Sequence, residues 1–198
     1  MSANPFFVLA SSSKSRISIL KNAGLKFRGT KHVCDEKYHK KRFVNLKYKP
    51  SKISLELSKL KAQSINTQNT LVVGSDTVID FGGKTIDKAT SVSGAKKKIK
   101  KLSGKKHSII SSISAYYNNR LVWCCTIRTK VTIKKLGDSE INEYLKMCGS
   151  SILNSVGCYQ LEKRGTTIIE DIDGDHFNVM GFPIFPFLFF LKKFNVKK

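Results

Sequence analysis

The chain has 198 residues and a formal net charge of +22, with 36 Lys and Arg against 14 Asp and Glu. This length fits one domain with a sizeable core. The charge indicates polyanionic partners such as nucleotides, nucleic acid or an anionic membrane surface. Because the lysines are spread over the whole chain, solvated lysine-rich faces account for the excess without a dedicated nucleic-acid interface.

The cysteine pattern and the apolar runs exclude several classes of protein. The five cysteines form no Cys-x-x-Cys pair and have no His at zinc-finger spacing, which indicates free thiols in a reducing compartment. The N-terminus lacks the features of a signal peptide. The longest apolar stretch, residues 182–191, is too short to span a bilayer and contains two prolines. We therefore expect a cytoplasmic protein without a membrane partner.

The first part of the chain predicts a strand, a serine-rich turn and a helix. The apolar residues 6–10 predict a buried strand, serines occupy positions 11–13, and residues 16–23 have helical spacing. Residues 26–33 predict a second strand. The basic and aromatic residues 37–51 predict a mobile loop.

The middle of the chain predicts a helix and a strong strand. Apolar and small residues recur at helical spacing, with Lys61 beside the stripe. The residues of the stripe are Ile53, Leu57, Leu60 and Ser64. Residues 71–79 predict the strand, which the glycines at 82–83 turn into a hairpin with residues 84–86.

The second half continues to mix helices and strands. The expected elements are a helix capped by Ser91 or Ser93 and ended by Gly104, strands at 107–117 and 121–133, a helix capped by Asp138, a strand at 166–172, and a final apolar helix near Pro183. The order contains both hairpins and crossovers, so the chain belongs to a mixed α and β class.

Asp76 is the most informative residue. It interrupts an apolar, β-branched run, and an unpaired buried carboxylate is costly. Polar residues after an apolar strand favour a site at its carboxyl end, where open α/β sheets bind ligands. Asp76 is therefore a candidate metal ligand or general base. The alternative is an Asx turn that closes the strand.

The serine turn and a second acid pair are further candidates. Free N–H groups at a helix start attract phosphate, and Arg16 can hold a phosphate with two hydrogen bonds, although a plain serine cap explains the same pattern. Asp35-Glu36 follows a candidate strand, and with Asp76 it provides carboxylates of the kind that bind Mg²⁺. Taken alone, none of Lys61, Lys88 and Glu162 indicates a function.

Read together, these segments resemble the Maf family of nucleoside triphosphate pyrophosphatases over essentially the whole chain. The residues that carry the resemblance are Leu9-Ala10-Ser11-Ser12-Ser13 with Arg16, Asp35-Glu36, Lys61-Ala62, Gly74-Ser75-Asp76-Thr77-Val78, Asp87-Lys88, Leu102-Ser103-Gly104 with His107, Gly157-Cys158-Tyr159, Ile172-Asp173-Gly174-Asp175, and Asn178-Val179-Met180-Gly181-Phe182-Pro183-Ile184.

The resemblance implies an α/β fold with a mixed central sheet flanked by helices, related to house-cleaning inosine triphosphatases and often a homodimer. The expected organisation is a single domain over residues 1–198 that can form two lobes around a central cleft. The implied reaction cleaves a nucleoside triphosphate between the α- and β-phosphates, giving a nucleoside monophosphate and pyrophosphate. It uses a divalent metal, Mg²⁺ or Mn²⁺.

The resemblance also assigns roles to residues. Its catalytic carboxylate falls on Asp76, and its acid pair falls on Asp35 and Glu36, so Glu36 and Asp76 are the expected metal ligands. Its substrate-binding residues are Ser13, Arg16, Lys61, Lys88 and the base-selecting Glu162. Glu in that last position resembles the 7-methyl-GTP branch of the family rather than the dTTP/UTP branch, which has Gln.

Four positions depart from the family pattern: Ser15, Leu60, Ala89 and Lys163. Leu60 and Ala89 keep open a catalytically weak regulatory protein of cell division with the same fold. The charge keeps open a basic nucleic-acid-binding protein, but the chain has no recognised RNA or DNA module, so we expect no specific nucleic-acid partner.

Overall fold

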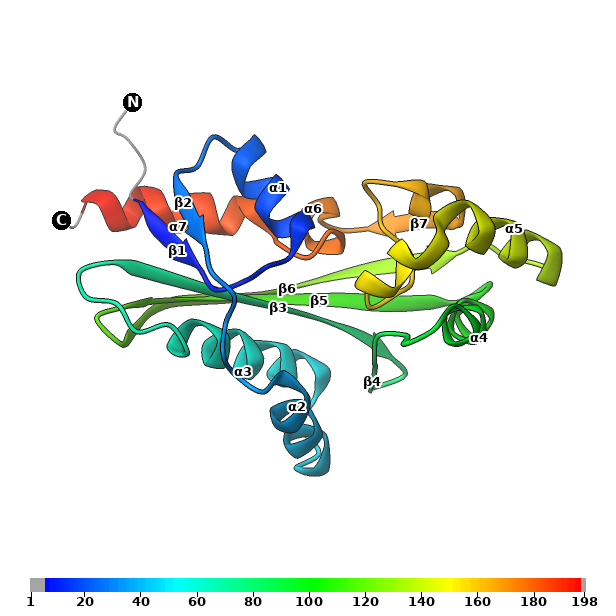
Figure 1. Cartoon of the computed structure of the whole chain (residues 1–198), viewed down its shortest axis with the longest axis horizontal. Helices are drawn as coiled ribbons and strands as arrows, with labels where there is room; N and C mark the ends of the chain where they lie inside the picture. The colour runs from blue at the N-terminus through cyan, green and yellow to red at the C-terminus, as the bar shows by residue number, and fades with distance from the viewer. Residues whose placement is uncertain (1–5, 197–198) are drawn as a thin grey trace.

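A computed structural model describes residues 6–196 of the protein. Seven strands form one mixed sheet in the order β2-β1-β3-β5-β6-β7, with β4 also paired to β3 (Figure 1). Strand β1 is parallel to β2 and β3, and the other pairs are antiparallel. The strands are β1 (Phe7–Leu9), β2 (Phe27–Gly29), β3 (Leu71–Phe81), β4 (Lys84–Ile86), β5 (Lys106–Tyr117), β6 (Arg120–Ile133) and β7 (Ile169–Asp173).

Helices cover both faces of the long strands. Helices α2 and α3 lie on one side of β3 and β5, and α1 and α7 lie on the other (Figure 1). The helices are α1 (Lys14–Asn22), α2 (Glu36–Asn45), α3 (Pro50–Gln63), α4 (Val92–Leu102), α5 (Asp138–Cys148), α6 (His176–Val179) and α7 (Ile184–Val196), with 3₁₀ turns at Gly149–Asn154 and Arg164–Thr167. The predicted α/β fold with a mixed central sheet is confirmed.

Helix α3 packs directly on β3 because Gly74 has no side chain. A Cβ on Gly74 would lie 2.1 Å from the Ser58 carbonyl oxygen and 2.6 Å from the Ala62 nitrogen. Two buried serines of α3 form hydrogen bonds across this contact. Ser54 Oγ donates to the Asp76 carbonyl at 3.0 Å, and Ser58 Oγ lies 2.6 Å from Ser114 Oγ. The buried face of α3 is therefore partly polar, which an apolar stripe alone did not indicate.

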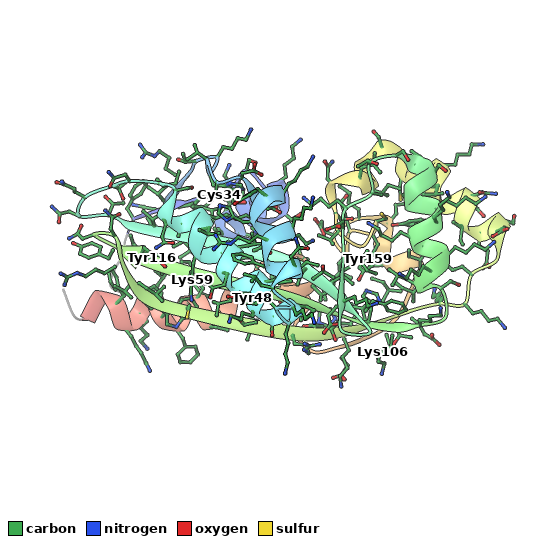
Figure 2. The ribbon with its side chains drawn as sticks, turned by 90° about the horizontal axis from the view of Figure 1, so that it is seen from below. Cys34, Tyr48, Lys59, Lys106, Tyr116 and Tyr159 are labelled. Atoms are coloured by element: carbon green, nitrogen blue, oxygen red, sulfur yellow. The ribbon has the colours of Figure 1, made fainter. Side chains whose placement is uncertain are left out.

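Two large hydrophobic clusters lie toward the two ends of the sheet. One joins β1 and α1 to α7 and includes Phe7, Leu20 and Phe187. The other joins α4 and α5 to the start of β5 and the end of β6 and includes Ile99 and Tyr144. Seen from the side of α2 and α3, α3 crosses the sheet in one half of the molecule and α4 lies in the other (Figure 2). A single sheet carries both clusters.

The prediction of a mobile loop over residues 37–51 is wrong. Residues Glu36–Asn45 form α2, and Pro50 is the first residue of α3. The Asp35 carboxylate accepts a hydrogen bond from Tyr38 N at 3.0 Å, which caps the helix. Asp35 therefore has a structural role at the start of α2, while Glu36 begins the helix.

The prediction of a strand at residues 71–79 is confirmed, and the alternative of an Asx turn that closes the strand at Asp76 is wrong. Strand β3 continues through Asp76 to Phe81, because every residue from Leu71 to Asp80 pairs with β5. Among the smaller differences, Gly137 rather than Asp138 is the cap of α5, and β2 and β7 are shorter than predicted. Within residues 6–196, none of the helices is long and apolar enough to cross a bilayer.

Candidate active site

The site lies where β1 stops beside β3. Strand β1 pairs with β3 as far as Leu9 opposite Val73, and β4 pairs with β3 only from Ile79. Between these points the described residues leave one edge of β3 without a strand partner, at Asp76 and Thr77. The chain after β1 turns through the serines at 11–13 into α1, so polar side chains gather at this gap.

Lys61 joins the two carboxylates of the site. Its ammonium nitrogen lies 2.6 Å from Asp76 Oδ1 and 2.8 Å from Glu36 Oε2. The side chains of Lys61 and Asp76 are each 4% exposed, whereas that of Glu36 is 41% exposed. The second oxygen of Asp76, Oδ2, is buried and has no hydrogen-bond partner among the described residues. The residues predicted to carry the chemistry therefore come together from α2, α3 and β3.

The electrostatics of this cluster keep it charged. Burial favours neutral Lys61, but Asp76 and Glu36 outweigh that effect and raise the pKa of Lys61. Burial would raise the pKa of Glu36, yet Lys61, Lys88 and Arg16 lower it to about 2. The two carboxylates therefore favour the protonated, cationic form of Lys61.

Arg16 reaches the site from the first turns of α1. Its Nε donates to the Gly181 carbonyl at 2.9 Å, its Nη2 to Thr77 Oγ1 at 3.0 Å and its Nη1 to Ser11 Oγ at 3.3 Å. Burial lowers the pKa of Arg16, while Asp76 and Glu36 oppose that shift. Ser13 is the N-cap of α1, and its hydroxyl lies 3.5 Å from Arg16 N, so Ser13 sets the start of the helix that presents Arg16.

Lys88 lies in the exposed loop between β4 and α4. Desolvation lowers the pKa of Lys88, Glu36 opposes the shift, and the positive charges of Arg16 and Lys61 add to it. The neighbouring Asp87 forms an ion pair with Lys40 of α2 at 2.6 Å. This contact joins the loop of Lys88 to the helix that begins with Glu36.

Glu162 stands apart from the carboxylate pair. It is exposed, just before the 3₁₀ turn Arg164–Thr167, and its Oε1 accepts a hydrogen bond at 2.5 Å from Ser15 Oγ on α1. Two adjacent residues of α1 therefore reach both parts of the site, the region of Glu162 and the carboxylate pair. Ser15 contacts the predicted base-selecting residue, and Arg16 lies by the carboxylates.

The sequence did not indicate the groups that hold Arg16. The available signal for Thr77 was its position directly after Asp76 on a strand. Adjacent strand residues point to opposite faces of the sheet, so this position places Thr77 on the face opposite to Asp76. Gly181 is 165 positions from Arg16, and no spacing pattern links two residues so far apart.

The carboxylates can take part in binding a divalent metal. Residues 6–196 bring together no group of three or more His, Cys, Asp and Glu side chains suited to a metal ion. The unpartnered Asp76 Oδ2 and the nearby Glu36 nevertheless fit an ion that takes its remaining ligands from water and substrate phosphates, as Mg²⁺ prefers.

Comparison with known proteins gives a consistent result over nearly the full chain. A family model described as Maf-like protein matches residues 6–194. A nucleoside triphosphate pyrophosphatase of Caulobacter vibrioides is 33% identical over 193 residues, which cover 97% of this chain and 96% of the relative. A 7-methyl-GTP pyrophosphatase of Bartonella quintana is 34% identical over 191 residues, or 96% of each chain.

Proposed function

Because this chain belongs to the Maf family, we propose that it is a nucleoside triphosphate pyrophosphatase, a hydrolase of the α–β phosphate bond that releases a nucleoside monophosphate and pyrophosphate. One observation of the structure carries the proposal. Three cations, Arg16, Lys61 and Lys88, surround the carboxylates of Glu36 and Asp76, and one buried Asp76 oxygen is left without a partner.

The three cations divide two tasks in this reaction. Arg16 and Lys88 bind the phosphates and offset the charge that accumulates on them in the transition state. Lys61 holds Asp76 through Oδ1, at 2.6 Å, and so fixes the direction of Oδ2. Ser13 caps α1 and keeps Arg16 in place.

Asp76 Oδ2 is the atom we assign to the chemical step. It either accepts the proton of the water that attacks the α-phosphorus, as a general base, or ligates the metal. We propose that Glu36 and Asp76 hold Mg²⁺ or Mn²⁺ together with water and the substrate phosphates. The bound metal would neutralise phosphate charge and lower the pKa of the attacking water.

Glu162 is proposed to read the base. A carboxylate only accepts hydrogen bonds, and guanine offers the adjacent donors N1–H and N2–H. Ser15 binds Oε1 of Glu162 and leaves Oε2 for the base. We therefore propose a guanine-type triphosphate, including the 7-methylated form named for the Bartonella quintana relative, as the preferred substrate.

The test is pyrophosphate release from GTP, 7-methyl-GTP, UTP, dTTP, ATP and CTP, each with Mg²⁺ or Mn²⁺. We expect release of pyrophosphate and nucleoside monophosphate, fastest with a guanine base, and loss of activity with EDTA that is restored by the metal. Release of inorganic phosphate instead, or no turnover of any nucleotide, would refute the function.

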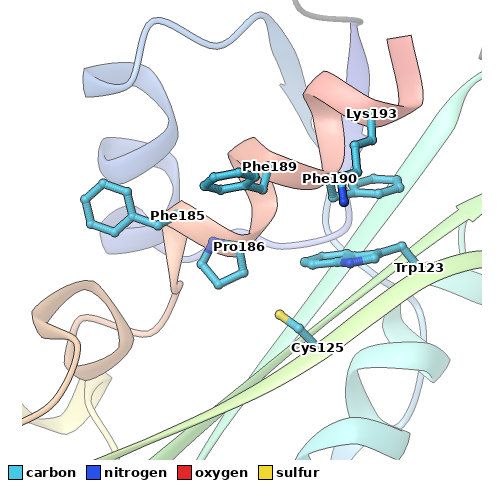
Figure 3. A pocket seen from close by; sticks show the side chains of 7 residues that line it. All are labelled: Trp123, Cys125, Phe185, Pro186, Phe189, Phe190 and Lys193. Atoms are coloured by element: carbon cyan, nitrogen blue, oxygen red, sulfur yellow. The ribbon is translucent and has the colours of Figure 1, made fainter. Parts of the chain in front are cut away.

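A homodimer is proposed from an apolar groove on the outer side of α7. Phe185, Phe189 and Phe190 of α7 line a hollow of about 540 Å³ together with Trp123 and Cys125 of β6, and Phe190 stacks on Trp123 (Figure 3). Phe185 and Phe189 are 59% and 71% exposed. Within residues 6–196, β6 pairs with β7 only through Lys130–Ile133, so its earlier part is also a free sheet edge beside this groove.

Light scattering tests the dimer. A second copy should cover the groove, because exposed aromatic patches are enriched at protein interfaces. We expect a dimer of the wild type and a monomer of Phe185→Ser/Phe189→Ser, while Val33→Ser, which changes an exposed apolar residue elsewhere, should remain a dimer. A cytoplasmic location and the absence of a specific nucleic-acid or membrane partner remain predictions.

A further inference from the structure

Among residues 6–196, the groups that hold the guanidinium of Arg16 are all neutral oxygens. Its three recorded acceptors are the carbonyl of Gly181 and the hydroxyls of Ser11 and Thr77. Arginine has five N–H donors, so one N–H on each terminal nitrogen is left to bind an anion. The neutral partners fix the position of the charge without neutralising it.

A chain of hydrogen bonds leads from Arg16 into the protein. Thr77 Oγ1 accepts from Arg16 and lies 2.9 Å from Ser111 Oγ, which in turn donates to the Asn178 carbonyl at 3.1 Å. A carbonyl can only accept. With Ser111 donating to Asn178, the Thr77 hydroxyl accepts from Arg16 and can donate either to Ser111 Oγ at 2.9 Å or to the Gly181 carbonyl at 3.3 Å. In both arrangements Thr77 is an acceptor for Arg16.

Asn178 anchors the far end of this chain. It is fully buried, and its side-chain amide donates to the Ile109 carbonyl at 3.0 Å and to Thr129 Oγ1 at 2.9 Å. Its Oδ1 accepts from Ser111 N at 3.1 Å. All of its side-chain hydrogen-bonding groups are thus used to tie α6 to β5 and β6.

Asn178 also fixes the position of the Gly181 carbonyl, which accepts the hydrogen bond of Arg16 Nε. Gly181 follows α6 with φ of +100°, a conformation that side chains rarely adopt, and a Cβ there would lie 3.3 Å from Thr77 Oγ1. Asn178 therefore fixes two of the three acceptors of Arg16, one through Ser111 and Thr77 and the other through the short turn to Gly181.

We propose that Thr77, Ser111 and Asn178 are positioning residues that hold the Arg16 guanidinium ready to bind the substrate phosphates, and that they act on hydrolysis through Arg16. The inference rests on the proposed function. It predicts that loss of the Ser111 hydroxyl weakens phosphate binding, although Ser111 touches no substrate.

The first test compares two adjacent serines of β5. Ser111 and Ser112 are both fully buried, but the Ser112 hydroxyl bonds Thr126 of β6 at 2.9 Å and has no recorded contact with the Arg16 chain. We expect Ser111→Ala to lower kcat/KM about tenfold, chiefly through KM, as for loss of a hydrogen bond that orients a charged group. Ser112 lies opposite Asp76 on the neighbouring strand, so Ser112→Ala is a control for substrate binding only, and its KM should stay within about twofold of the wild type.

A double-mutant cycle tests whether Ser111 acts through Arg16. In the absence of Arg16 the Ser111 hydroxyl has nothing to position, so Arg16→Ala/Ser111→Ala should be no slower than Arg16→Ala alone. Losses that multiply in the double variant would overturn the inference.

Thr77 gives a second route if Ser111→Ala does not fold. Thr77→Val keeps the branched shape and removes the hydroxyl, so it should reproduce the rise in KM, and Thr77→Ser should restore a near-normal KM. Wild-type kinetics of Thr77→Val would overturn the inference.

A binding measurement separates this inference from the proposed function. Calorimetry with an α,β-methylene GTP analogue should show weaker binding to Ser111→Ala and Thr77→Val than to Ser112→Ala, whether or not the wild type turns over GTP. Equal affinity of the wild type and these three variants would refute the positioning role. Absence of pyrophosphate release by the wild type would refute only the function.

Discussion

The two carboxylate oxygens of Asp76 have different surroundings. Oδ1 lies 2.6 Å from Lys61 Nζ, and the buried Oδ2 has no partner among the described residues. In Asp76→Asn the shape is kept while the charge and the proton-accepting oxygen are lost. We expect kcat to fall by about 10²-fold or more, measured by pyrophosphate release.

Asp80 provides the control for that variant. It lies on the same strand, and its carboxylate pairs with Arg128 at 2.9 Å. Asp80→Asn should leave turnover within a factor of about three, because a partly exposed ion pair contributes little. Near-normal turnover of a folded Asp76→Asn protein would remove Asp76 from the mechanism.

Base selection by Glu162 is the second prediction at the residue scale. Glu162→Gln replaces an acceptor with a group that both donates and accepts, which suits uracil and thymine. The ratio of kcat/KM for GTP to that for UTP should fall by a factor that corresponds to about 1–3 kcal/mol. Glu170→Gln, also an exposed acid, is the control.

Competition kinetics with GTP, 7-methyl-GTP, UTP and dTTP measure this ratio. If the wild type prefers dTTP and the substitution leaves the ratio unchanged, Glu162 does not read the base. Ser15→Ala, which removes the hydroxyl bound to Glu162, should reduce the preference for guanine in the same direction.

The sequence indicated most charged groups of the site and few of their neutral partners. Asp76 could be predicted because a carboxylate in an apolar run is unusual, and Arg16 because it follows a serine turn. Ser111 carries no such signal, and Asn178 entered only as one residue of the family resemblance, without a role, since buried serines and asparagines have many structural uses. Their importance depends on contacts between residues 67 positions apart.

At the scale of elements, the contact of α3 with β3 decides where Lys61 and Asp76 meet. Gly74→Ala would place a Cβ 2.1 Å from the Ser58 carbonyl, so the helix must move away from the strand. We expect a loss of about 1–3 kcal/mol or more in the free energy of unfolding, together with reduced activity from displacement of Lys61.

Chemical denaturation monitored by circular dichroism measures that loss. Gly29→Ala in β2 is a suitable control, because the nearest atom to the added Cβ is 3.7 Å away, an ordinary contact. If Gly74→Ala were as stable as Gly29→Ala, the backbone contact would not restrict the position of α3.

Local signals predicted most elements but not their ends. The strands predicted at 107–117 and 121–133 form a hairpin, and Asn118 and Asn119 between them both have positive φ, as a tight turn requires. Helix α2 was missed because it has no buried residue and hence no apolar stripe. The strand predicted at residues 71–79 continues to Phe81, because its pairing with β5 extends through Asp80 and its pairing with β4 through Phe81.

At the scale of the whole molecule, the charge of +22 affects binding to any polyanion. Since the lysines are dispersed, we expect duplex DNA or RNA to bind weakly, without sequence preference, and with affinity that falls steeply as salt rises. Fluorescence anisotropy at 50 and 300 mM salt checks this. Nanomolar, sequence-selective binding at physiological salt would instead indicate a nucleic-acid-binding function.

The second hydrophobic cluster contains a buried titratable pair. His107 at the start of β5 is 3% exposed, and its Nε2 lies 2.5 Å from the hydroxyl of Tyr159. Its Nδ1 is buried and has no partner among the described residues. A protonated imidazole would place an unpaired charge among the residues that join α4 and α5 to the sheet.

This pair makes stability depend on pH. Burial lowers the pKa of His107 from its usual 6.5 to about 4 in the folded protein. Between these values the unfolded chain binds more protons than the folded one, so the free energy of unfolding must fall as the pH decreases. The loss is about 3 kcal/mol across this range.

His107→Gln cannot be protonated and should lose this part of the pH dependence, although its stability at pH 7 will also change. His176→Gln, at an exposed position in α6, should keep the wild-type dependence. Urea denaturation of the three proteins at pH 7, 5.5 and 4.5 measures the slopes, and equal slopes for the wild type and His107→Gln would show that His107 is not the group that titrates.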